Sequence, residues 1–65
     1  MTMQTARGTW NIYGINLVST DCIYQDIKTA IENGTASHSM LQQKTGYRAP
    51  IIVDFKHKTI NFRQF

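Results

Sequence analysis

The stretch that decides the fold is residues 21–34, DCIYQDIKTAIENG, which combines a helix start, an apolar stripe and a helix stop. Ser19, Thr20 and Asp21, at and just before its start, supply N-cap chemistry, because a hydroxyl or carboxylate can accept from free amides of the first helical turn. Gly34 can end a helix because glycine adopts the left-handed conformation at little cost. The stretch therefore predicts a helix over residues 21–33, with one face formed by Ile23, Ile27, Ala30 and Ile31.

Upstream of this helix, residues 9–18 alternate well enough to predict a strand. Trp10 and Ile12 form one apolar pair, and Ile15 and Leu17 form a second pair on the other side of Gly14. The interior glycine predicts either a bulge or a strand that starts only at Ile15. Residues 1–8 are expected to be a flexible segment that precedes a single small domain over residues 9–65.

Downstream, Thr35 or Ser37 can cap a second, shorter helix that runs to about Lys44 and ends at Gly46. Two apolar runs follow, Pro50–Phe55 and Thr59–Phe62, and they predict an antiparallel hairpin across residues 56–58. The expected fold class is α+β, with a short N-terminal strand, two or three helices, and a C-terminal hairpin packed as one small three-stranded sheet.

The chain is small, and its sequence offers neither an internal disulfide nor a structural zinc site to stabilise the fold. Its 65 residues can form one core, and the single Cys22 allows no internal disulfide. We expect Cys22 to be buried as a small hydrophobe. Dimerisation is the remaining way to bury more surface, and the expected interface residues are Ile60, Phe62 and Phe65. No apolar run has the length of a signal peptide or a membrane span, so a cytoplasmic protein without a membrane partner is predicted.

Basic residues are concentrated in the second half of the chain. The formal net charge is +3, and five of the seven Lys and Arg residues lie from Lys44 onward, together with one acid, Asp54. A cationic half is what a phosphate-binding face requires. The alternative is a soluble surface that is basic without being a binding site.

The order of the expected elements resembles that of the small Cro-type repressors of temperate bacteriophages. In that family a helix-turn-helix carries a small residue, then a turn glycine, then an apolar residue, and here Ala30, Gly34 and Met40 stand at these spacings. The likeness covers about residues 14–62 and includes the strand near Ile15 and the C-terminal hairpin. Asn33, beside the turn glycine, stands at a position where the family usually has an apolar residue.

The resemblance implies a repressor-like regulator that reads the major groove of double-stranded DNA as a homodimer. Three side chains of the second motif helix would face base edges, two cations near its end would contact phosphates, and the hairpin turn would reach the backbone as a wing. In that order, these residues are Ser37, His38 and Gln42, then Lys44 and Arg48, then Lys56 and Lys58.

The sequence shows no catalytic, metal-binding or cofactor-binding pattern. No nucleophile motif of known spacing is readable, and the four acids are dispersed. A non-enzymatic protein is therefore expected, with no cofactor. The second functional interpretation is a small inhibitor or adaptor that binds a host protein through a helix face or through a strand edge at Thr59–Phe62.

Overall fold

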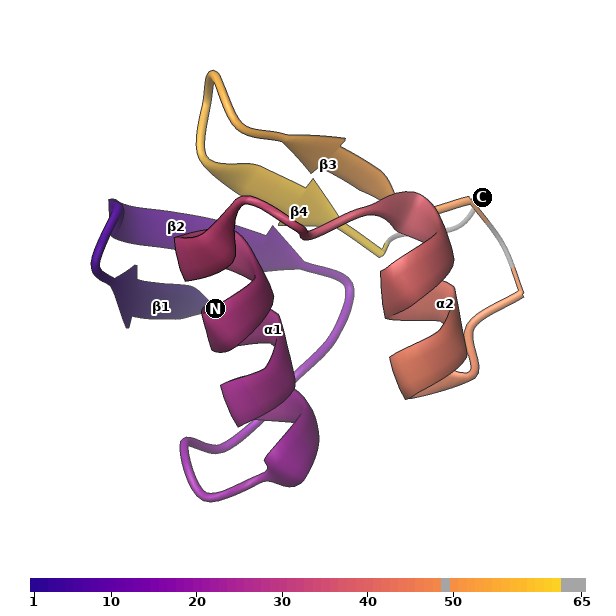
Figure 1. Ribbon diagram of the computed structural model, residues 1–65. Coiled ribbons are helices and arrows are strands. Elements are labelled where there is room, and N and C mark those ends of the chain that lie inside the picture. The colour runs from indigo at the N-terminus through magenta and orange to yellow at the C-terminus, as the bar shows by residue number, and fades with distance from the viewer. Residues whose placement is uncertain (49, 63–65) are drawn as a thin grey trace.

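A computed structural model describes residues 1–48 and 50–62 of the chain (Figure 1). Among these residues, neither helix is long and apolar enough to cross a membrane. The elements in chain order are β1 (Thr2–Thr5), β2 (Gly8–Tyr13), α1 (Cys22–Asn33), α2 (His38–Thr45), β3 (Ile52–Asp54) and β4 (Thr59–Asn61).

The described strands form one four-stranded mixed sheet in the order β1-β2-β4-β3. Each end of the chain contributes an antiparallel hairpin, and the two hairpins join where β2 and β4 pair in parallel, with Ile12 opposite Ile60. The predicted three-stranded sheet is therefore wrong. The N-terminal contribution is a hairpin and not a single strand.

β1 lies within residues 1–8, which were expected to have no regular structure. Its sequence carries only a weak strand pattern, because Met3 is its one buried side chain, while Thr2 and Gln4 are exposed. The turn to β2 depends on Gly8, whose φ is +105°. A glycine with positive φ after two ordinary turn residues is typical of a hairpin that closes with a bulge. Arg7-Gly8 is thus the local signal that the prediction overlooked.

β2 covers only the first part of the strand predicted over residues 9–18. It ends at Tyr13, and Gly14 follows with φ +87°. Ile15 and Leu17 lie in the connection to α1, where both are half-buried against the core. Gly14 therefore ends the strand instead of delaying its start, and the second apolar pair packs from a loop.

Both helices start and end close to the predicted residues. α1 ends at Gly34, which has φ +73° and donates its N–H to the carbonyl groups of Ala30 and Ile31. Ser37 caps α2 by accepting from the Met40 N–H, and Gly46 ends it with φ +78°. Asp21 occupies the N-cap position of α1, but its carboxylate accepts from the Val18 N–H and makes no cap bond.

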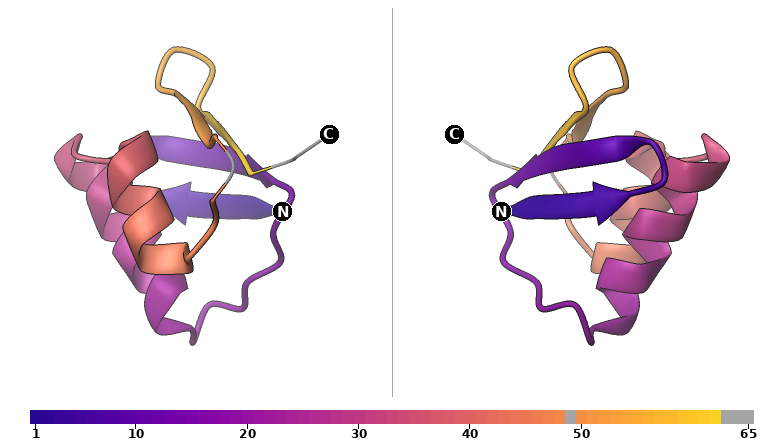
Figure 2. Two further views of the ribbon diagram at one scale, coloured as in Figure 1. Left: turned by 90° about the vertical axis from the view of Figure 1, so that its right-hand side faces the viewer. Right: turned by 90° about the vertical axis from the view of Figure 1, so that its left-hand side faces the viewer.

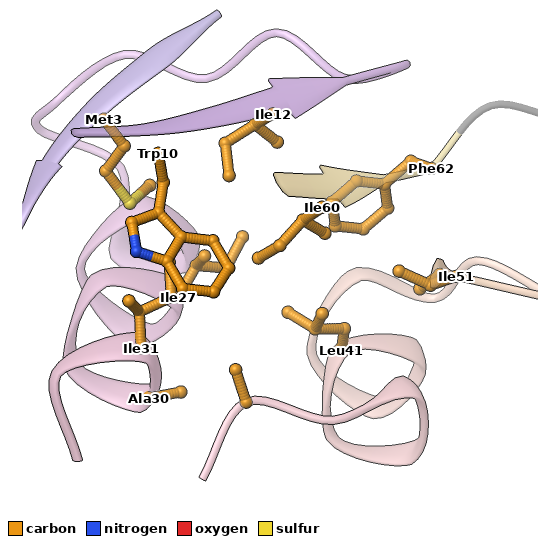
Figure 3. Close-up of a cluster of buried hydrophobic side chains, with 11 residues drawn as sticks. Met3, Trp10, Ile12, Ile27, Ala30, Ile31, Leu41, Ile51, Ile60 and Phe62 are labelled. Carbon is orange, nitrogen blue, oxygen red and sulfur yellow. The ribbon is translucent and has the colours of Figure 1, made fainter. Parts of the chain in front are cut away.

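The two helices cover one face of the sheet and leave the other face open (Figure 2). The core lies between these two layers, with strand side chains above and helix side chains below (Figure 3). Burial of this apolar surface is the main contribution to stability in so small a domain. The buried core residues are Met3, Trp10, Ile12, Ile27, Ala30, Ile31, Ala36, Leu41, Ile51, Ile60 and Phe62.

Three predicted environments need correction. Ile60 and Phe62, expected in a dimer interface, are 0% and 1% exposed within the single chain, so their side chains have no surface left for a partner. They are buried because Ile60 lies in the central strand β4 and Phe62 directly follows that strand, so both side chains join the core between the sheet and the helices. Cys22 is exposed and not buried, since it lies on the outer side of the first turn of α1. Phe65 lies outside the described residues.

Candidate nucleic-acid interface

The outward surface of α2 is set by one inward side chain. Leu41 is the buried residue of this helix. Successive residues of an α-helix are rotated by about 100°, so residues two positions before and after Leu41 point almost directly away from the core. These residues are Ser39 and Gln43, and both are exposed. Neither was predicted as a site residue, although the helical period measured from Leu41 would have identified them.

Two of the predicted base-reading residues make hydrogen bonds within the chain. The Ser37 hydroxyl accepts from the Met40 N–H at 3.2 Å and so caps α2. The Gln42 amide donates to the Arg48 carbonyl at 3.0 Å and ties the end of α2 to the following segment. His38 is exposed at the start of the helix, as the prediction requires. We call the four exposed residues of α2 its outward surface: Ser39 and Gln43 point away from the core, whereas His38 and Lys44, three positions from Leu41, lie at its flanks.

The two predicted phosphate contacts near the end of α2 differ in their surroundings. Lys44 Nζ lies 3.6 Å from Asp26 Oδ2 of α1, with both side chains about half exposed. Arg48 is exposed, and its guanidinium makes no ion pair or hydrogen bond with the described part of the chain. Arg48 is thus available to an anion, while Lys44 would have to leave a weak surface pair.

The turn between β3 and β4 holds the remaining predicted cations. Asp54 Oδ1 accepts from the Lys56 and His57 N–H groups, and Asp54 Oδ2 lies 2.7 Å from His57 Nδ1. The hydrogen bond from the His57 side chain is the main cause that lowers the pKa of Asp54. The Lys56 and Lys58 side chains are exposed. Lys58 also has φ +56°, an unusual conformation for a residue with a side chain.

The structure does not place this turn beside α2. In Figure 1 the turn is at the top of the molecule, whereas α2 extends downward on the right. The carbonyl of Lys58 accepts from the Asn11 N–H, and the Lys58 ammonium lies over Gly8, so the turn contacts the β1–β2 hairpin instead. The predicted site residues therefore divide into two groups, one around α2 and one at the turn.

The four acids all make contacts within the chain, which changes the charge left at the surface. Asp21 and Glu32 accept from main-chain N–H groups, Asp26 pairs with Lys44, and Asp54 holds the β3–β4 turn. Between Glu32 and Asp54 the sequence contains no acid at all. This acid-free segment includes all of α2, so the outward surface of α2 carries hydrogen-bonding groups and positive charge.

The chain matches no protein-family model, no curated protein and no solved structure. Among the residues that the structure describes, no group of three or more His, Cys, Asp or Glu side chains could hold a metal ion.

Proposed function

We propose that this chain is a small, non-enzymatic DNA-binding regulator that inserts α2 into the major groove of double-stranded DNA. By occupying an operator it would block transcription, as a repressor of a phage or another mobile element does. Such a protein would act in the cytoplasm, where bacterial DNA is accessible.

The observation that carries this proposal is the composition of the outward surface of α2. His38, Ser39 and Gln43 can donate or accept hydrogen bonds, Lys44 is cationic, and the acid-free segment extends on both sides of the helix. The major groove presents donors and acceptors on base edges between two rows of phosphates. A helix with neutral hydrogen-bonding groups at its centre and cations at its end fits that arrangement.

Within this proposal the residues have separate roles. Ser39 and Gln43 point furthest from the core and would contact base edges, and a glutamine amide can bond to adenine with both of its polar atoms. Lys44 and Arg48 would contact phosphates, which positions the helix but does not select a sequence. Ser37 and Gln42 would act indirectly, by holding the two ends of α2 in place.

The test is a fluorescence-anisotropy titration of a labelled random duplex at about 50 mM and about 200 mM salt. Binding should weaken steeply with salt, because each phosphate contact releases counterions. Arg48→Ala should reduce the slope of log affinity against log salt by about one. Lys28→Ala is the matched control: it removes the same charge from α1, away from this surface, and should leave the slope nearly unchanged.

Sequence reading is tested with a duplex selected from a random library by the wild-type chain. Gln43→Ala should relax the preference at one base pair, which is a discrimination of about 1–3 kcal/mol. Absence of any duplex binding at low salt would contradict the proposed function. An equal loss for Arg48→Ala and Lys28→Ala would show a response to net charge and no defined interface.

A second candidate function is supported by two apolar side chains on the open face of the sheet. Tyr13 and Ile52 are 49% and 65% exposed. They lie on either side of Asn61 in the sheet: Tyr13 pairs with Asn61 from β2, and Ile52 pairs with it from β3. Such a pair could anchor a host protein bound by an inhibitor or adaptor. In that case Ile52→Ser should abolish partner binding while Arg48→Ala has no effect. The edge pairing predicted at Thr59–Phe62 is not available, because β4 lies between β2 and β3.

A further inference from the structure

β1 is an edge strand whose outer main-chain groups have no partner among the described residues. The Met1 amine donates to the Ile12 carbonyl, and the Ile12 N–H donates back to the Met1 carbonyl. In an antiparallel pair, residues that exchange two hydrogen bonds alternate with residues that exchange none. Thr2, opposite Asn11, and Gln4, opposite Thr9, must therefore direct their N–H and C=O groups away from β2.

The two edges of the sheet differ in how well they are protected against pairing. Proteins protect an edge strand with charged side chains, prolines, bulges or very short strands. β3 has only three residues, follows closely on Pro50 and carries Asp54. β1 carries no charged side chain and no proline, and its outermost position in the sheet is visible in Figure 2. β1 is therefore the edge that is open to another strand.

A second copy of β1 fits this edge by symmetry. When two such strands lie antiparallel with their Met3 residues opposite one another, each Thr2 faces the Gln4 of the other copy. In each Thr2/Gln4 pair, the outward main-chain N–H and C=O groups of the two copies exchange two hydrogen bonds. The two pairs together give about four hydrogen bonds across the interface. This register uses every outward main-chain group of Thr2 and Gln4 in both copies.

We infer that the protein forms a homodimer through antiparallel pairing of β1 with β1 of a second copy, which extends the sheet to eight strands. A two-fold axis between the two opposed Met3 residues makes the interface identical for both partners, as in most homodimers. The dimer itself does not depend on DNA binding. Its use in presenting two α2 helices to two half-sites rests on the function proposed above.

The distribution of charge is compatible with a second copy at this edge. The chain carries a net charge of +3, so two copies repel wherever their cations meet. At β1 they meet through neutral side chains, with Thr2 beside Gln4 of the partner on the open face of the sheet. The exposed cations Lys44, Arg48, Lys56 and Lys58 lie outside β1, and Arg7, in the turn after β1, directs its guanidinium to the Glu32 carbonyl of α1.

The experiment combines sedimentation equilibrium with amide hydrogen exchange, and it uses no DNA. Wild-type protein should approach about twice the 7.5 kDa mass of one chain as its concentration rises. The Thr2 and Gln4 amides should exchange more slowly at high than at low concentration, by about tenfold or more. Gln4→Pro removes one outward donor without breaking a bond to β2, so it should weaken association by about tenfold or more while circular dichroism stays unchanged.

The control is Gln4→Ala, which keeps the main-chain donor and should associate like wild type. A wild-type chain that stays monomeric at all concentrations would overturn the inference. A dimer that Gln4→Pro leaves intact, or one with no concentration-dependent protection at Thr2 and Gln4, would place the contact elsewhere, for example on the open face. Since DNA is absent, these outcomes are separate from those that test the proposed function.

Discussion

The ammonium of Lys44 in α2 lies 3.6 Å from the carboxylate of Asp26 in α1, so the cation nearest the proposed DNA interface is already paired within the chain. Both side chains are about half exposed, and such pairs contribute only about 0–1 kcal/mol to stability. The pair therefore links the two helices only weakly, and Lys44 can leave Asp26 when a phosphate approaches.

Asp26→Asn should therefore increase affinity for a random duplex by about threefold at low salt, because it frees Lys44 and removes a negative charge near the phosphates. Lys44→Ala should decrease the affinity. Anisotropy titrations on both variants and on the double variant give the comparison. If Asp26→Asn binds like wild type, Lys44 does not contact DNA.

The stability of the β3–β4 turn should depend on the ionisation of Asp54. Bonds from His57 lower its pKa from the ordinary value of 3.8, so folding favours the ionised carboxylate. A lowered folded pKa gives stability that is present above about pH 4 and is lost as the pH falls through the folded value. Thermal unfolding of the wild type should show this loss in acid, whereas His57→Ala should show a smaller loss and Asp54→Asn should lack this contribution.

The two helix-ending glycines should differ in their tolerance of a methyl group. Both have positive φ, so either change to Ala costs about 1 kcal/mol from backbone strain alone. A methyl at Gly46 meets nothing within 4 Å, but one at Gly34 would lie 3.2 Å from the Arg7 guanidinium, whose Nε donates to the Glu32 carbonyl. Urea unfolding should show Gly34→Ala as the more destabilising change. In an Arg7→Ala background the two costs should become equal.

Lys58→Gly should stabilise the folded chain by about 0.5–1 kcal/mol, because it relieves a left-handed conformation at φ +56°. The main-chain bond from the Asn11 N–H to the Lys58 carbonyl is kept. Lys58→Ala removes the same side chain without relieving the backbone, so chemical denaturation should show no gain for it. A gain in both variants would point to relief of charge repulsion instead of backbone strain.

The helices could be predicted because their signals are local. The apolar stripe of α1, the Ser37 cap and the glycines at 34 and 46 each act within a few residues, so the elements start and end close to the predicted positions. The sheet could not be predicted in the same way. β1 presents one apolar side chain to the core, and Gly14 is as compatible with a strand end as with a bulge.

In the candidate site, too, some positions follow from local signals and others depend on tertiary contacts. His38 and Arg48 are exposed, whereas Gln42 makes a hydrogen bond within the chain. Gln43 takes the outward position, because Leu41 is the residue that docks α2 on the core. Lys56 and Lys58 lie at a separate turn, since the parallel pairing of β2 with β4 brings that turn to the β1–β2 hairpin.

By itself, the sequence determined one amphipathic helix, a shorter second helix, the glycines that end both helices, a C-terminal hairpin and a basic, acid-free segment around α2. Only the tertiary structure decided that β4 pairs in parallel with β2 and that β1 is an edge strand. It also decided that Ile60 and Phe62 are buried in the core and not exposed to a partner. The physical reason is that caps and helical periods depend on neighbours in the chain. Strand order depends on which distant apolar faces can be buried together.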